Sequence, residues 1–375
     1  MTPITRKEIE DGMILFCNSG SHAYGLNTEA SDRDYKGVCI APRRFYVSLD
    51  AFEQKDKGWD AEPDPDTRFP ELDGSDSVVY DVRRYLQLLQ SQNPNILEML
   101  WQGPEDYLFL SPLGQILIDN RYKLISKRIA GTFVQYARAQ IKKMQTHRKW
   151  LLDPPMKRPE WEDYGVKTPY LTHTQIEAFI EYLYLLVKDR IEYYQEAKEL
   201  YEIIHDRIDW KSVLKQSILP KECAEVTQEI TRANSDYMAL LRVSQQYRSD
   251  LKRWSNYQDW LKNRNVKRSE IERDCGYDGK NASHCIRLIH MAIEGLRTGE
   301  IVVNRKKAGD HQLLLDIKYG KLPYAELDQM VNELFEKAEY VTQNECVLPS
   351  SIDKSLINQL CEEVIAEQVN IPTFR

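Results

Sequence analysis

The 375-residue sequence lacks several features that mark common classes of protein. It has no apolar run near the roughly 20 residues that a membrane-spanning helix needs, no evident repeat of fixed period, and no C-x-x-C pair. Its cysteines are odd in number and widely spaced, which argues against both a disulfide framework and a zinc cluster. The seven are Cys17, Cys39, Cys223, Cys275, Cys285, Cys346 and Cys361.

The first residues also lack the apolar core of a signal peptide, because four of the first ten are charged. Hydrophobic content of 42% and charged content of 29% are those of a globular, soluble protein, so we expect a cytoplasmic location and no membrane partner. Single cores rarely exceed about 250 to 300 residues. The length therefore predicts two domains.

The most informative segment is residues 20–34, Gly-Ser-His-Ala-Tyr-Gly-Leu-Asn-Thr-Glu-Ala-Ser-Asp-Arg-Asp. The apolar run 13–17 that precedes it predicts a buried strand, and the polar residues that follow predict a turn. Gly20 allows close approach of the backbone to a ligand, and the Ser21 hydroxyl is a further donor for a phosphate oxygen. Gly20 and Ser21 are therefore the candidate triphosphate-binding residues.

Asp32 and Asp34 begin a second predicted strand. Residues two apart on a strand share a face, with Cα atoms roughly 6.6 Å apart, so both carboxylates can converge on one or two hard cations. Mg²⁺ or Mn²⁺ bound in this way would bridge nucleotide phosphates and lower the pKa of an attacking hydroxyl. The alternative is an ordinary surface turn, since Asp-x-Asp and Gly-Ser are both common in loops.

In strand-turn-helix-strand order, the two halves together resemble the signature of the DNA polymerase beta superfamily of nucleotidyltransferases, in its compact form Gly-Ser-x-Ala-x-Gly followed by Ser-Asp-x-Asp. The resemblance implies Mg²⁺-dependent transfer of a nucleoside monophosphate. It also implies a third catalytic and metal-binding carboxylate on a neighbouring strand. Asp81, in the predicted strand 77–82, is the first choice and Asp76 the second; the alternative for Asp81 is a helix N-cap.

Two further segments resemble a family of predicted nucleotidyltransferases from bacteria and large phages that is linked by inference to RNA repair. The first is Asn-Pro-Asn-Ile-Leu-Glu at residues 93–98, and the second is residues 277–299. In the second, Lys280, His284 and Arg287 are spaced to share one helix face, where they would bind triphosphate or a nucleic-acid end. The alternative is a solvated face, with His284 as a satisfied, partly buried histidine.

The net charge of −7 is unevenly distributed. Residues 121–158 contain eleven lysines and arginines and one acid, Asp153, so this segment either follows a phosphate backbone or is a solvated helix surface. Residues 242–273 carry aromatics at helical spacing, which indicate either a helix core or base stacking. These aromatics are Tyr247, Trp254, Tyr257 and Trp260.

The sequence thus predicts an α+β fold: a nucleotidyltransferase domain with a small mixed sheet over residues 1–125, containing a loop insertion at 53–76, followed by a helical domain over 126–375 that closes the cleft and binds the acceptor. The preferred reaction is transfer from a nucleoside triphosphate to an RNA 3′ end, tRNA-like or damaged. The alternatives are transfer of AMP to a protein and a catalytically silent nucleotide-binding module.

Overall fold

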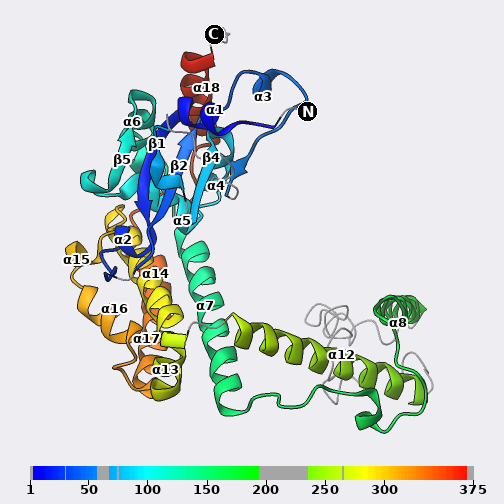
Figure 1. Ribbon diagram of the computed structural model, residues 1–375. Helices are drawn as coiled ribbons and strands as arrows, with labels where there is room; N and C mark the ends of the chain where they lie inside the picture. Colours follow the sequence, from blue (N-terminus) through cyan, green and yellow to red (C-terminus); the bar gives the residue numbers. More distant parts are fainter. Residues whose placement is uncertain are drawn as a thin grey trace. The chain divides into compact units, whose positions relative to one another are not determined.

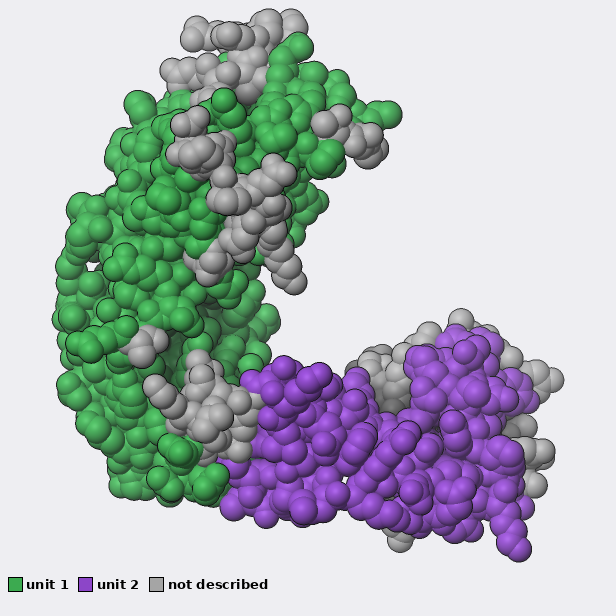
Figure 2. All heavy atoms as spheres, in the orientation of Figure 1, with its two compact units in different colours: residues 1–148, 267–375 green, residues 149–266 purple. Residues whose placement is uncertain are grey.

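The computed structural model describes residues 3–29, 31–56, 67–73, 76–193, 235–263 and 266–369, and confirms the α+β class (Figure 1). Parts of the predicted loop insertion, 57–66 and 74–75, lie outside the described residues. Two compact units are present: residues 1–148 with 267–375, and residues 149–266 (Figure 2). The units divide the chain differently from the predicted boundary at 125, because the last hundred or so residues pack with the first unit.

The first unit contains a five-stranded mixed sheet in the order β3-β4-β2-β1-β5. β2 and β4 are parallel, and the other neighbouring pairs are antiparallel. The parallel pair places the first residues of both strands at the same end of the sheet. The strands are β1 (Met13–Ser19), β2 (Asp34–Cys39), β3 (Gln54–Lys55), β4 (Asp76–Asp81) and β5 (Tyr107–Leu110).

Alternation along β2 and β4 separates their side chains between the two faces of the sheet. Val38 and Tyr80 belong to a large core shared with the helices, whereas Tyr35 and Val79 belong to a smaller core on the opposite face. Gly37 fits against that smaller core, because a Cβ there would lie 3.0 Å from the Met13 Sδ. We call the first face, which also carries Asp34, the helix face.

Helices of the first unit surround the large core. The central one, α14 (Gly279–Thr298), is capped by the Asp278 carboxylate and ends at Gly299 with φ 77°. Its side chains are buried on nearly every side, which marks a core helix rather than an amphipathic surface helix. The first unit also contains α1 (Arg6–Asp11), whose Ile9 belongs to the smaller core, and α7 (Ile129–Leu152), whose last residues from Lys149 belong to the second unit. Its remaining helices are α2 (Gly20–Ala23), α3 (Arg44–Val47), α4 (Val82–Gln90), α5 (Pro94–Leu97), α6 (Pro112–Asp119), α13 (Val266–Cys275), α15 (Arg305–Ala308), α16 (His311–Lys318), α17 (Tyr324–Asn344) and α18 (Lys354–Val369).

The second unit contains α8 (His173–Tyr193) and α12 (Ser235–Lys262), joined by an apolar cluster that includes Ile180 and Leu241. The aromatic residues of α12 pack inside this unit: Tyr247 lies 5.4 Å from Trp161, and Tyr257 lies 5.9 Å from Trp150, ring centroid to ring centroid. Helix packing rather than base stacking therefore explains their spacing. Within the described residues, no helix is long and apolar enough to cross a membrane.

Candidate active site

The turn after β1 brings the backbone of Gly20 directly against a carboxylate. Gly20 has φ 60°, a conformation that side chains rarely tolerate, and a Cβ there would lie 2.1 Å from the Oδ2 of Asp34. Both its conformation and its contact therefore require glycine. Ser21, next in α2, accepts a hydrogen bond from the Leu26 amide through its carbonyl, which closes the turn.

Three carboxylates interact at the start of β2. Asp34 is the first residue of the strand and pairs in register with Asp76, the first residue of β4. Asp32 is exposed and lies two residues before the strand, not within it as predicted. Burial and the charges of Asp76 and Asp32 raise the pKa of Asp34, while Lys280 and Lys36 act in the opposite direction.

These acids fit a divalent cation. Carboxylate oxygens are the ligands that Mg²⁺ takes, and a cation would offset the burial and the neighbouring acids that together raise the pKa of Asp34. As they stand, no three or more acidic, histidine or cysteine side chains among the described residues are arranged to hold a metal ion. Asp32, Asp34 and Asp76 are therefore an electronegative cluster that would need side-chain adjustment to coordinate Mg²⁺.

Asp81, the first choice for the third carboxylate, lies elsewhere. Asp81 pairs with Cys39 of β2. It lies five residues along β4 from Asp76, or about 16 Å at the rise of a strand, and the alternation of side chains places it on the face of the sheet opposite Asp34. Its carboxylate caps α4 by accepting from the Arg83 amide at 3.0 Å and also accepts from the Tyr46 hydroxyl at 2.6 Å. The structure thus assigns Asp81 to helix capping and brings Asp76, the second choice, to Asp34.

The motif loop is held by the C-terminal part of the first unit. The amide of Arg305, on α15, donates to the Tyr24 carbonyl at 2.9 Å, and the Nζ of Lys318, on α16, donates to the Leu26 carbonyl at 2.9 Å. The loop also closes on itself, because the Thr28 amide donates to the Ser31 hydroxyl at 2.9 Å. Helices more than 270 residues later in the chain therefore fix the loop between Gly20 and Asp34.

Lys280 is the one member of the predicted cationic row that the structure places near the cluster from an exposed position. It lies in the first turn of α14 and is close enough to Asp34 to lower the pKa of that carboxyl. A lysine at this position can pair with a negatively charged ligand that binds beside the acidic cluster.

Arg287, in contrast, is closed off from solvent, and its predicted contact with a nucleotide stays a prediction that its burial does not support. Its guanidinium lies 3.5 Å from the centroid of the Tyr24 ring, and one of its nitrogens lies 3.5 Å from the Oε2 of Glu98. The helical spacing of the row is correct, but α14 is buried on this side as well. Arg287 therefore packs against the motif loop through Tyr24.

Two residues of this buried network, Lys36 and Glu98, were not predicted as site residues. The Nζ of Lys36 donates to Glu98 at 3.1 Å, and the Tyr24 hydroxyl donates to the same carboxylate at 2.9 Å. Although burial acts to raise it, the pKa of Glu98 is lowered by Lys36 and Arg287, so the carboxylate stays charged. The available signal was strand alternation, because Lys36 follows Asp34 by two residues on the helix face.

His284 is mostly buried and neutral. Burial, followed by the charge of Arg287, lowers its pKa to about 3, and its Nε2 has no hydrogen-bond partner among the described residues. The predicted row of three cations is therefore one exposed cation, one neutral imidazole and one buried arginine. The unsatisfied nitrogen can serve a ligand as a neutral donor or acceptor.

Replacing His284 by glutamine is expected to reduce the loss of stability in acid. In the unfolded chain a histidine binds its proton near pH 6.5, whereas His284 in the folded chain does so only near pH 3. The unfolded state therefore binds more protons in this interval, and the folded protein loses about 1.4 kcal/mol per pH unit as the pH falls below 6.5. Urea unfolding at a series of pH values should show a shallower decline for the variant; parallel curves would contradict the assignment.

The basic segment 121–158 serves partly as packing. Arg148 lies 3.9 Å from the centroid of the Tyr324 ring and donates to the Gly276 carbonyl, and Arg138 lies over Phe335. Other cations of the segment, such as Arg128 just before α7 and Lys142 on α7, are exposed. Part of the segment thus packs against other elements and part is exposed to solvent, and its predicted contact with a phosphate backbone stays a prediction.

Comparisons with known proteins bear on this geometry. A sequence profile described as the RNA repair pathway DNA polymerase beta family matches residues 2–186. Over 357 residues the chain is 22% identical to an uncharacterized 38.9 kDa protein from the nrdC-mobD intergenic region of Enterobacteria phage T4, covering 93% of this chain and 95% of that protein. No solved structure matches the chain. The profile includes Gly20, Asp34 and Asp76, whereas Lys280 and the helices that hold the motif loop lie beyond it.

Proposed function

Since residues 2–186 belong to the RNA repair pathway DNA polymerase beta family, we propose that this protein transfers a nucleoside monophosphate from a nucleoside triphosphate to an acceptor hydroxyl. The observation that carries the proposal is the contact between the Gly20 backbone and the Asp34 carboxylate, with Asp76 beside Asp34 on the parallel strand. A turn that can receive phosphate and acids that can bind a cation thereby meet at one end of the sheet.

Each side chain has a role in this proposal. Gly20 and Ser21 hold the phosphates through backbone and hydroxyl donors, Lys280 neutralises phosphate charge, and the neutral His284 offers its unsatisfied nitrogen. Asp32, Asp34 and Asp76 would hold Mg²⁺ or Mn²⁺. When bound, that metal would stabilise phosphate charge and lower the pKa of the acceptor hydroxyl.

The buried Lys36, Glu98, Tyr24 and Arg287 network acts on position rather than on substrate. Lys36 joins β2 to the 3₁₀ turn Glu98–Trp101, and Tyr24 joins the motif loop to the same carboxylate. Phosphoryl transfer depends mostly on positioning and electrostatics, so a fixed distance between the loop and β2 is what the chain must supply. We therefore assign this network to holding Gly20 and Asp34 in place.

The acceptor we propose is an RNA 3′ end, in keeping with the RNA repair description of the family. The test incubates the full chain with each α-labelled nucleoside triphosphate and Mg²⁺ or Mn²⁺, offers RNA, DNA and protein acceptors, and locates the label. We expect label at RNA 3′ ends. Label in protein instead would replace RNA by a protein acceptor, and no label in any acceptor would contradict transferase activity.

A further inference from the structure

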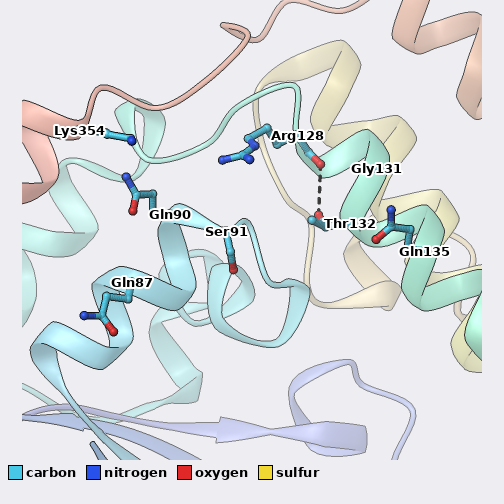
Figure 3. A pocket seen from close by; sticks show the side chains of 8 residues that line it. All are labelled: Gln87, Gln90, Ser91, Arg128, Gly131, Thr132, Gln135 and Lys354. Atoms are coloured by element: carbon cyan, nitrogen blue, oxygen red, sulfur yellow. Dashed lines mark hydrogen bonds between the residues drawn. The ribbon is translucent and has the colours of Figure 1, made fainter. Parts of the chain in front are cut away.

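A polar groove of about 470 Å³ opens on the first unit between the end of α4, the start of α7 and the start of α18 (Figure 3). Its walls include Gln87 and Gln90 from α4, Arg128 and Gln135 from the α7 side, and Lys354 from α18. In Figure 3, Arg128 and Lys354 extend into the groove from opposite sides. None of its lining residues is acidic.

This lining suits a polynucleotide better than a small apolar ligand. Cations pair with phosphate oxygens, and glutamine amides both donate to and accept from base edges. Apolar ligands need walls of hydrophobic and aromatic side chains, which these residues do not supply. Gly131 adds backbone without a side chain, and a Cβ there would meet no atom within 4 Å, so the α7 wall is open to close approach.

The two helical walls are fixed to each other by a strained residue. Gln92 is buried and has φ 57°, the only positive φ outside glycine among the described residues. Its side-chain amide donates to the Leu89 and Leu124 carbonyls at 2.8 and 3.1 Å, and its own carbonyl accepts from the Thr132 hydroxyl at 2.8 Å. Strain of this kind persists where surroundings enforce it, often at ligand sites. The groove is therefore preformed.

Residues 93–97 connect α7, which forms one wall of the groove, to β2, which begins with Asp34. On one side of this turn the Nζ of Lys36 donates to the Asn95 carbonyl at 2.8 Å; on the other the side-chain Nδ2 of Asn93 donates to the Tyr136 hydroxyl at 3.1 Å. Tyr136 lies on α7 next to Gln135 of the groove wall. One turn of chain thus separates the groove from the strand that begins with Asp34.

We propose that this groove binds a single-stranded polynucleotide, with Arg128 and Lys354 on its phosphates and the glutamines on its bases. Lys142 extends the track, because it lies two helical turns, roughly 10.5 Å, beyond Gln135 on the exposed side of α7. Delivery of the strand's 3′ end to Asp34 rests on the proposed function, but binding in the groove does not.

The test measures binding without nucleotide or divalent metal, by fluorescence anisotropy of labelled RNA and DNA oligonucleotides of one sequence over a range of salt concentrations. For Arg128→Ala with Lys354→Ala we expect affinity to fall about tenfold and the slope of log affinity against log salt to shrink by about 1.4, because each phosphate contact on a single strand contributes about 0.7. Gln135→Ala should weaken binding without changing the slope.

The matched control is Lys7→Ala with Lys337→Ala, which removes the same charge from exposed positions outside the groove and should leave affinity and slope unchanged. The Asp32→Ala, Asp34→Ala variant should also keep its affinity for the strand, so a failure of the transfer chemistry is distinguishable from a failure of the groove. The proposal would be overturned if the Arg128→Ala, Lys354→Ala variant bound both oligonucleotides with the affinity and the salt dependence of the unsubstituted protein.

Discussion

A double variant Asp32→Ala, Asp34→Ala is expected to lose nucleotidyl transfer by on the order of 10³-fold or more, the scale on which electrostatic stabilisation of a transition state is lost. Its fold should be intact. Burial and neighbouring acids raise the pKa of Asp34, which means that the charged carboxylate is held in the folded state at a cost. At a pH above that pKa, removing the Asp34 carboxylate should therefore leave the free energy of unfolding unchanged or raise it.

The measurement pairs initial rates of label transfer with urea unfolding at pH 7.5 or above. Asp11→Ala with Asp119→Ala is the control, because both aspartates are exposed, lie in the first unit and carry the same charge. Transfer at the parent rate in the Asp32, Asp34 variant would remove these residues from the proposed site. Loss of transfer together with loss of folding would show that the acids support structure instead.

The second large effect comes from comparing Asp76→Ala with Asp81→Ala. Asp76 is exposed and adjoins Asp34, so its loss should reduce transfer on the order of 10²- to 10³-fold while stability is kept. Asp81 is buried, caps α4 and accepts from the Tyr46 hydroxyl, so its loss should cost about 1 to 3 kcal/mol of stability while the folded fraction still transfers.

Rates corrected for the folded fraction, with unfolding followed on the same samples, separate the two roles. The same substitution is made at both ends of β4, so each variant is the matched control of the other. The reverse pattern, with transfer lost in Asp81→Ala and kept in Asp76→Ala, would contradict the proposed third carboxylate.

Local patterns were sufficient to predict the elements of the site. The apolar run before Gly20, the turn and the strand containing Asp34 all follow from neighbouring residues, and so does the α+β class. Helical spacing in α14 was also predicted. What spacing did not reveal is that α14 is surrounded by other elements, which is why Arg287 is buried on a face expected to meet solvent.

Asp81 shows why pairing between strands needs the tertiary structure. The sequence predicted a strand at 77–82 that contains Asp81, and β4 agrees with this prediction. Which face of the sheet Asp81 occupies depends on the register between β2 and β4, and no residue of either strand specifies this register alone. The register assigns Asp76 to the side of Asp34 and Asp81 to the opposite side.

The sequence by itself determined the chemistry that this protein presents: a glycine turn, an Asp-x-Asp pair and the strand and helix that carry them, because these depend on residues a few positions apart. Only the tertiary structure decided which distant residues join them. Asp76, Lys280 and the helices that hold the motif loop reach Asp34 and its loop through packing and strand register, which are properties of the whole core rather than of any short segment.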